Sequence, residues 1–359
     1  MVTTRFPNKK FWNKKKIFIT GHTSFKGTWL KVWLEKLGSF ISGYSNSYPS
    51  NPLSLYKLIY KQEKIRKKDD INDYDNLLKS LQKSKPEIVF HLAAQSIVSE
   101  ASQKPLDTFK SNIIGTVNLI EACLKVKSIK IIMIVTTDKC YEEKNYFKSY
   151  KETSNLGGSE PYSASKAAVE LIAKSYTKKF KEMNKKVVTL RAGNVIGGGD
   201  WKKNRLVPDI YKFIYEKKKL VFRNLNGIRP WQHVIDCLNG YLLATEYASK
   251  NRYYYNNWNF SPELKYQKNV KWMVDKIISI NNLNIKYRKE NVKFYESQKL
   301  TLSSKKANTN LHWSTLINNQ LLINYVNDWY KSYYLNISPR ELCLNQIQNF
   351  YRLVNKKIN

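Results

Sequence analysis

The sequence predicts an α/β protein whose centre is a doubly wound parallel sheet. Two apolar runs, EIVFH at 87–91 and IIMIVT at 131–136, are continuous, as strands buried on both faces of such a sheet require. Segments with helical spacing of apolar residues alternate with these and other strand-like runs. The chain also opens with a strand, a glycine-containing turn and a helix, the order with which a doubly wound sheet begins.

The predicted elements follow one another through the first half of the chain. The first strand covers residues 16–20, the next helix covers 28–37, and Gly38 is well placed to end that helix. The other strands are expected at about 39–44, 87–91, 131–136 and about 186–191, and the other helices near 73–84, 107–126 and 162–182. After residue 196 the sequence becomes irregular and rich in Gly, Asn, Pro and Trp, which is typical of substrate loops.

The composition is that of a globular protein without a membrane segment. Apolar residues make up 42% of the chain, and no apolar run approaches the ~20 residues that span a bilayer. The Lys-rich N-terminus lacks the apolar core of a secretory signal. The four cysteines form no CxxC pair and the four histidines form no HxxxH pair. We therefore expect no disulfide framework, no metal site and a cytoplasmic location.

The formal net charge of +34 raises the question of a nucleic-acid partner, since basic patches attract phosphate. The lysines are scattered over the whole length, however, and Asn, Ile and Tyr are abundant as well. An AT-rich coding bias produces this mixture without selection for a partner, so we expect no specific nucleic-acid binding. A positive field would still help to gather an anionic nucleotide substrate.

The turn after the first strand, TGHTSFKG at 20–27, is a candidate dinucleotide site, although an ordinary strand-to-helix turn is the alternative. A glycine-rich turn before a helix lets backbone N–H groups and the helix dipole approach a pyrophosphate. Ser24 replaces the second Gly of the usual GxxGxxG spacing, and its hydroxyl could itself donate to phosphate. The candidate cofactor-binding residues of this turn are Gly21, Thr23, Ser24, Phe25, Lys26 and Gly27.

Two further segments predict acid–base chemistry. In YSASK, Tyr162 and Lys166 share one helical face, and the ammonium is expected to lower the phenol pKa from its usual ~10. Tyr162 could then take a proton from a hydroxyl whose carbon loses hydride to a nicotinamide. The strand at 131–136 leads into TTDKCY, so Thr137, Asp138 and Lys139 lie at its carboxyl end. A solvated helix face and a surface ion pair are the alternatives for these two segments.

Together these segments resemble the extended short-chain dehydrogenase/reductases of the NAD-dependent epimerase/dehydratase family. Nucleotide-sugar 4,6-dehydratases carry an acid–base pair directly after the active-site Thr. CDP-glucose 4,6-dehydratases carry Asp-Lys followed by Cys-Tyr-Glu, as this chain does. The resemblance implies that Thr137 is the active-site Thr, Asp138 the acid and Lys139 the base. A Lys can be a base only if its pKa falls well below ~10.4, and burial and the charge of Lys166 both favour that fall.

The resemblance also implies cofactor contacts outside the glycine turn. HLAAQ at 91–95 would pass under the cofactor, and Asp70 with Ile71 would contact adenine, although a helix N-cap beside Asn72 is an equal alternative. The implied contacts are Asp70, Ile71, Leu92, Ala93, Ala94, Gln95, Asn112, Tyr162 and Lys166. No Asp or Glu ends the second strand, where 43–46 read GYSN, so this position leaves the choice between NAD and NADP open.

Substrate contacts are implied by RAGNVIGGGDW at 191–201 and IRPWQHVI at 228–235. Arg229 would pair with a diphosphate through its planar fork, whereas a core position is an equal alternative for His233. Residues 197–199 are expected to form a flexible glycine loop. The implied substrate-binding residues are Asn194, Arg205, Arg229 and His233.

The implied architecture has two domains. A Rossmann-type NAD-binding domain comprises residues 14–195 and about 232–258. A smaller, discontinuous α/β substrate domain comprises about 196–231 and 259–335, and residues 336–359 form a helical extension. Relatives usually dimerise through two helices, here about 107–126 and 162–182, so we expect a homodimer or homotetramer.

The implied activity is the NAD-dependent dehydration of CDP-glucose to CDP-4-keto-6-deoxyglucose. Oxidation at C4 acidifies the C5 proton, a base removes this proton, and an acid protonates the departing C6 hydroxyl. Hydride returned to C6 completes the reaction. The alternatives are an epimerase, a 4,6-dehydratase of another nucleotide sugar, and a non-catalytic binder of NAD or nucleic acid, which Ser24 and the high charge motivate.

Overall fold

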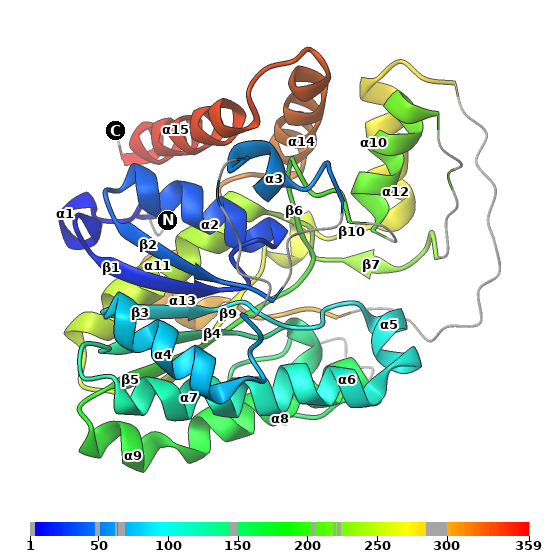
Figure 1. Cartoon of the computed structure of the whole chain (residues 1–359). Coiled ribbons are helices and arrows are strands. Elements are labelled where there is room, and N and C mark those ends of the chain that lie inside the picture. Colours follow the sequence, from blue (N-terminus) through cyan, green and yellow to red (C-terminus); the bar gives the residue numbers. More distant parts are fainter. Residues whose placement is uncertain are drawn as a thin grey trace.

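The computed structural model describes residues 4–46, 51–61, 63, 69–143, 149–202, 205–217, 220, 224–284 and 300–358. Its centre is a six-stranded sheet in the order β2-β1-β3-β4-β5-β9, in which every neighbouring pair is parallel. Helices cover both faces of this sheet (Figure 1). The predicted doubly wound α/β fold is therefore confirmed.

The five predicted strands occur close to their expected positions. The strands of the sheet are β1 (Lys16–Thr20), β2 (Phe40–Tyr44), β3 (Ile88–His91), β4 (Ile131–Val135), β5 (Lys186–Ala192) and β9 (Tyr255–Phe260). Every residue of β3 and β4 is buried, which explains why these two strands are continuous apolar runs. The sequence pattern does not predict β9 because this edge strand, YNNWNF, is rich in Asn.

Two hydrophobic cores lie on opposite faces of the sheet because successive strand residues point to opposite sides. Ile132 and Ile134 pack on one face with α4, α7 and α8, whereas Ile131 and Met133 pack on the other with α2 and α11. The helices of these two layers are α2 (Phe25–Lys36), α4 (Tyr74–Ser84), α6 (Pro105–Phe109), η1 (Lys110–Ile114), α7 (Gly115–Lys125), α8 (Pro161–Ser175), α9 (Thr177–Glu182) and α11 (Val234–Lys250).

The remaining elements surround this layered body. They are α1 (Lys9–Trp12), α3 (Leu55–Ile59), α5 (Val98–Gln103), η2 (Asp138–Cys140), β6 (Val195–Ile196), α10 (Leu206–Glu216), β7 (Ile228–Arg229), β8 (Gln232–His233), η3 (Leu264–Tyr266), β10 (Lys268–Asn269), α12 (Val270–Ile280), α13 (Lys305–Leu311), α14 (Asn319–Tyr334) and α15 (Pro339–Ile358). The short pair β7–β10 and helices α10 and α12 lie beyond the carboxyl ends of the main strands (Figure 1).

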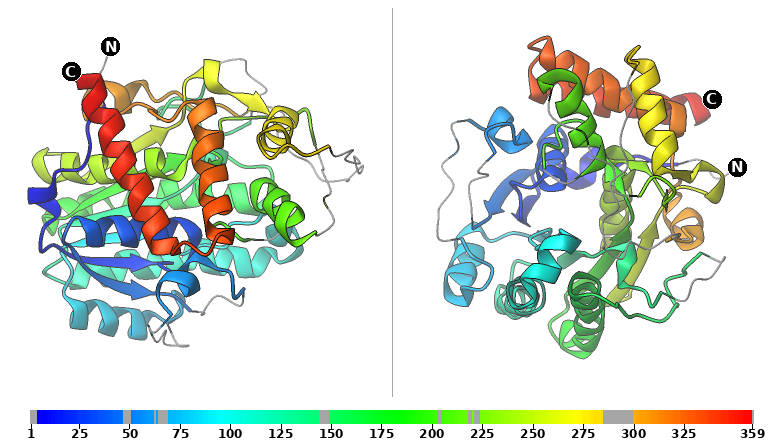
Figure 2. Two further views of the ribbon diagram at one scale, coloured as in Figure 1. Left: turned by 90° about the horizontal axis from the view of Figure 1, so that it is seen from above. Right: turned by 90° about the vertical axis from the view of Figure 1, so that its right-hand side faces the viewer.

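Two peripheral helices, α13 and α15, belong to segments that the predicted division places outside the NAD-binding domain. α13, expected in the substrate domain, contacts β9 and α11 of the main body. α15, expected as a C-terminal extension, packs across α2, α3 and α14 (Figure 2). Trp33 of α2 donates from Nε1 to the Tyr351 hydroxyl of α15 over 2.7 Å, so the extension is fixed to the body.

Candidate active site

The glycine turn is shaped for close approach of its own backbone to the loop after β3. Gly21 has a φ of +70°, and a Cβ there would lie 2.7 Å from the Ala93 nitrogen. A Cβ on Gly27 would lie 2.3 Å from the Gly21 carbonyl oxygen. Both positions therefore require Gly.

Ser24 fits the turn without strain. Its φ of −72° is ordinary for any residue, and its Oγ accepts a hydrogen bond from the Gly27 nitrogen over 3.2 Å. This contact caps α2, which explains why the helix begins three residues before the predicted residue 28. The Ser24 hydroxyl proton is not used by this bond, so the expected donation to a phosphate is compatible with the capping role.

A cavity of about 750 Å³ opens above the turn. Ten of the predicted cofactor-binding residues line it: Gly21, Thr23, Ser24, Phe25, Asp70, Ile71, Leu92, Ala93, Ala94 and Gln95. Its volume lies within the ~300–1,000 Å³ that is usual for small-molecule and cofactor sites. The turn, the HLAAQ segment and the Asp70–Ile71 pair thus form one continuous wall.

Asp70 does not cap a helix. The N-cap of α4 is Asp73, whereas the Asp70 Oδ1 accepts from the Asn72 backbone and side-chain nitrogens over 2.9 and 3.0 Å. The helix-cap alternative for Asp70 is therefore wrong. Asp70 lies on the cavity wall, and its contact with adenine stays a prediction. At the end of β2 the cavity is lined by Ser45 and Asn46.

Asn112 acts behind the cavity wall. Its Oδ1 accepts from the Gln95 nitrogen over 2.8 Å, and its Nδ2 donates to the Gln95 carbonyl over 3.0 Å and to the Ser165 hydroxyl over 2.9 Å. Asn112 is 1% exposed. It therefore braces the loop after β3 against α8, and any effect on the cofactor passes through Gln95.

The far wall of the cavity comes from the segment after β6. Arg205 lines the cavity and forms an ion pair with Asp200, with 2.8 Å between Nη1 and Oδ2. The preceding glycines are buried, and a Cβ on Gly198 would lie 1.9 Å from the Trp329 ring. The expectation of a flexible glycine loop is therefore wrong: the glycines allow tight packing of this wall on α14.

The predicted catalytic residues come together at the carboxyl end of β4. Thr137 donates to the Asp138 carboxylate over 3.0 Å, and the Lys166 ammonium donates to the Val135 carbonyl over 3.2 Å. Thr137, Asp138, Tyr162 and Lys166 are between 5% and 8% exposed. Helix α8 thus places its Tyr-x-x-x-Lys face against the turn that carries the acid–base pair.

The electrostatics of Tyr162 differ from the expectation. Burial raises its pKa to about 12, although a hydrogen bond with Thr137 opposes this increase. The expected lowering by Lys166 is not observed because desolvation dominates. Lys166 itself has a pKa lowered to about 8, chiefly by burial and next by the charge of Lys26.

Asp138 has the environment of a proton donor. Burial raises its pKa, while the charges of Lys139 and Arg229 and the hydrogen bond from Thr137 oppose the increase. Space for this carboxyl depends on Gly193, where a Cβ would lie 2.9 Å from the Asp138 Oδ2. A carboxyl with a raised pKa keeps its proton at higher pH than an ordinary Asp, as an acid catalyst requires.

The predicted substrate residues occupy different environments. Asn194 follows β5, and its carbonyl accepts from the Gln232 nitrogen over 3.1 Å. Arg229 is half-buried on β7, and its charge reaches Asp138. The structure therefore places Arg229, but not Asn194, in electrostatic contact with the catalytic turn.

His233 lies in the core. It is fully buried, its Nδ1 accepts from the Ile235 nitrogen over 3.3 Å, and the rings of Trp29 and Tyr325 pack against it. Burial lowers its pKa to about 3. His233 is therefore a core residue, and the substrate contact that the resemblance implies for it is wrong.

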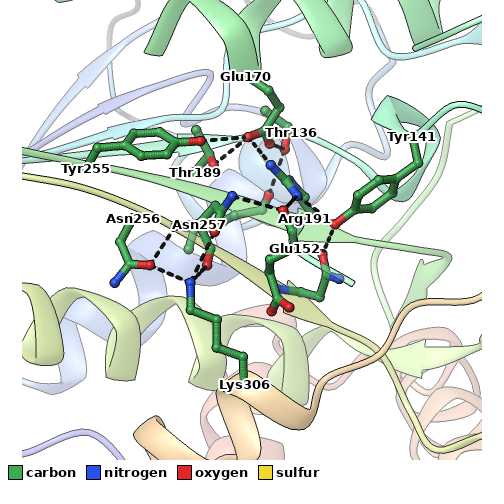
Figure 3. Close-up of polar contacts among 12 residues, drawn as sticks. Thr136, Tyr141, Glu152, Glu170, Thr189, Arg191, Tyr255, Asn256, Asn257 and Lys306 are labelled. Carbon is green, nitrogen blue, oxygen red and sulfur yellow. Dashed lines mark hydrogen bonds and ion pairs between the residues drawn. The ribbon is translucent and has the colours of Figure 1, made fainter. Parts of the chain in front are cut away.

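A buried ion pair that the residue patterns did not predict lies behind the turn that carries Asp138 and Lys139. Arg191 of β5 and Glu170 of α8 lie 2.6 Å apart between Nη2 and Oε2, with side chains 1% and 0% exposed (Figure 3). Each is a charged residue within a mostly apolar run, VVTLRA at 187–192 and AAVELI at 167–172. This pattern is the signal that could have identified them, because a buried charge needs a partner.

The described residues contain neither a metal-binding cluster nor a membrane-spanning helix. No group of three or more His, Cys, Asp or Glu side chains among them could hold a metal ion. None of the helices within the described ranges has both the length and the apolar character needed to cross a membrane.

Comparisons with known proteins agree with this geometry. The chain is 36% identical over 315 residues to the CDP-glucose 4,6-dehydratase of Salmonella typhimurium, covering 85% of this chain and 88% of that protein. The UDP-glucose 4-epimerase of Thermotoga maritima, solved with UDP-glucose, superposes with a TM-score of 0.78 at 19% identity, covering 89% and 99% of the two chains. The dTDP-glucose 4,6-dehydratase of Bacillus anthracis, solved with NAD, superposes with a TM-score of 0.73 at 21% identity, covering 89% and 97%.

The sequence model of the NAD dependent epimerase/dehydratase family matches residues 17–256. This range begins in β1, contains the glycine turn, the acid–base turn and α8, and ends in β9. The chain belongs to the NAD dependent epimerase/dehydratase family.

Proposed function

We propose that the chain is an NAD-dependent hydro-lyase that converts CDP-glucose to CDP-4-keto-6-deoxyglucose. The observation that carries this proposal is the pairing of Asp138 and Lys139 beside Thr137, on a turn that faces Tyr162. An epimerization needs no acid for a departing C6 hydroxyl, whereas a dehydration does. The similarity to the Salmonella enzyme supports CDP-glucose as the substrate.

The cavity fits a dinucleotide. Gly21 and Gly27 leave a cradle that a Cβ would fill, and the N-terminus of α2 presents backbone N–H groups to it. The cradle would hold the pyrophosphate, while Asp70 and Ile71 would hold the adenine end. NAD would supply a reversible hydride acceptor to this site.

The residues of the chain would handle the protons. Tyr162 would accept the proton of the C4 hydroxyl as C4 is oxidised, once the positive charge of bound NAD offsets the rise of its pKa by burial. Lys139 would remove the proton from C5, which the C4 ketone makes acidic. Asp138 would protonate the C6 hydroxyl, which leaves as water. Arg205 and Arg229 would hold the diphosphate of the substrate.

The test is product analysis with the purified chain. Incubation with NAD and CDP-glucose should yield a product that is lighter by one water and that carries a C4 ketone and a C6 methyl in NMR spectra. Tyr162→Phe should abolish the conversion while the variant remains folded. Consumption of CDP-glucose without this product, or appearance of CDP-galactose, would refute the dehydratase assignment. UDP-, GDP- and dTDP-glucose, assayed in parallel, would identify a different nucleotide preference.

We also propose a homodimer or homotetramer and a cytoplasmic location. Exposed apolar side chains of α6, η1 and α8, Leu106, Ile114 and Leu171, support an interface on these helices. The four cysteines are free and buried, as is usual in a reducing compartment.

A further inference from the structure

The buried pair Glu170–Arg191 contacts both ends of the acid–base turn (Figure 3). Thr136 immediately precedes this turn, and its hydroxyl donates to Glu170 Oε1 over 2.5 Å. Tyr141 immediately follows the turn, and its hydroxyl accepts from Arg191 Nη1 over 2.6 Å. The residues between these two anchors include Thr137, Asp138 and Lys139.

The Tyr141 anchor is held from several sides. Its hydroxyl donates to Asn259 Oδ1 on β9 over 2.7 Å, and its ring stacks on Tyr150 with centroids 5.1 Å apart. The Arg191 guanidinium lies 5.0 Å from the centre of the same ring. The end of the turn is thereby joined to β5 and β9, the two strands at one edge of the sheet.

The Glu170 carboxylate joins the turn to the catalytic helix. Glu170 lies four residues after Lys166 on α8, so the two side chains project from one helical face. The carboxylate also accepts from the Thr189 hydroxyl of β5 over 2.7 Å. Its charge raises the pKa of Lys166 and so opposes the effect of burial there.

We propose that Glu170 and Arg191 are positioning residues that hold the Asp138–Lys139 turn against the Tyr162–Lys166 face of α8. The inference rests on the proposed dehydratase function for its chemistry, but its geometry does not depend on the identity of the substrate. Small misplacements of reacting groups can cost about a hundredfold in rate. A rigid, buried anchor on both sides of the turn would prevent such misplacement.

Two Thr substitutions provide a matched test. Thr136→Val and Thr189→Val each remove one buried hydroxyl that donates to Glu170, but only Thr136 adjoins the catalytic turn. Direct removal of Glu170 or Arg191 is less informative because an uncompensated buried charge can unfold a protein. Thr136→Ser keeps a hydroxyl at the position and serves as the rescue variant.

Thr136→Val should lower kcat about tenfold to a hundredfold with KM changed less than about twofold, while Thr189→Val and Thr136→Ser keep kcat within about threefold. Hydrogen exchange read by mass spectrometry should show faster exchange at 136–142 in Thr136→Val alone. Two results would overturn the positioning role. One is equally faster exchange at 136–142 in Thr136→Val and Thr189→Val, and the other is parental exchange there in Thr136→Val.

The exchange measurement needs no turnover, so it separates two failures. A parent chain that leaves CDP-glucose unchanged would refute the proposed function, and the exchange pattern would still decide the positioning role. An active parent whose Thr136→Val variant keeps full kcat and parental exchange would refute the positioning role alone.

Discussion

Asp138 and Lys139 are adjacent in sequence but differ in their surroundings. Asp138 is 5% exposed and has a raised pKa, whereas Lys139 is half-buried at the surface of the same turn. The carboxyl therefore holds its proton in a desolvated position, while the amine can reach a substrate. The raised pKa suits Asp138 to the acid role, whereas the half-exposed Lys139 lacks the full burial expected of the base.

Replacing Asp138 by Asn should stop dehydration and spare oxidation at C4. The amide has the size of the carboxyl but cannot supply a proton to the leaving hydroxyl, so we expect product formation to fall by about 10²–10⁴-fold. Formation of reduced nicotinamide should persist and can be followed by its absorbance. Asp275→Asn, which changes an exposed carboxylate of α12, should leave both signals unchanged. Equal loss of both signals in Asp138→Asn would contradict an acid role confined to the dehydration.

The pH dependence of the parent should follow the same carboxyl. An acid catalyst works while it is protonated, and burial raises the pKa of Asp138 above the ordinary value. We therefore expect kcat to remain high through the range in which an ordinary Asp has already ionised, and to fall as the pH rises through the raised pKa. A kcat that instead falls in the range of ordinary Asp ionisation would contradict this assignment. Steady-state kinetics over a series of buffers measures this limb.

At the residue scale, the sequence predicted which side chains meet in the site, but it did not predict how burial changes their pKa values. Thr137, Asp138, Tyr162 and Lys166 meet because each follows from a local pattern on a strand end or a helix face. The rise of the Tyr162 pKa depends on burial, which residue spacing does not report.

At the scale of elements, apolar periodicity predicted the five central strands because their burial is encoded locally. It did not resolve breaks within helices. The predicted helix 107–126 consists of α6, the π-helical η1 and α7, and the predicted helix 162–182 divides into α8 and α9. The two-residue strands β6, β7, β8 and β10 carry too few residues for any periodicity, so only tertiary pairing defines them.

The wall segment between β6 and α10 should be sensitive to any side chain at Gly198. An added methyl would meet the Trp329 ring at 1.9 Å, so Gly198→Ala should lower the free energy of unfolding by about 1–3 kcal/mol. Urea denaturation measures this loss. Gly227→Ala is the matched control, because the atoms nearest to its Cβ belong to the flexible end of Arg229, at 3.1 Å. Equal destabilisation in both variants would contradict tight packing of this wall.

At the scale of the whole molecule, the high positive net charge opposes self-association of the chain. A formal charge of +34 draws anionic nucleotides toward a cavity whose walls include Lys110, Lys202 and Arg205. The same charge makes two copies of the chain repel each other. Any dimer must therefore draw its stability from apolar burial, and salt should strengthen it by screening the repulsion.

Leu171 of α8 provides the test of this assembly. Its side chain is 57% exposed, and α8 contacts both α6 and η1, which carry the exposed Leu106 and Ile114. Leu171→Glu should convert a dimer into monomers, because an interface would bury the introduced carboxylate without a built-in partner. Sedimentation velocity at about 0.15 M and about 0.5 M salt should show a dimer for the parent, tighter at the higher salt. Leu264→Glu, at a 55% exposed side chain on η3, which is not one of these three helices, should remain dimeric. A monomeric parent, or dissociation of both variants, would exclude the α6–η1–α8 surface as the interface.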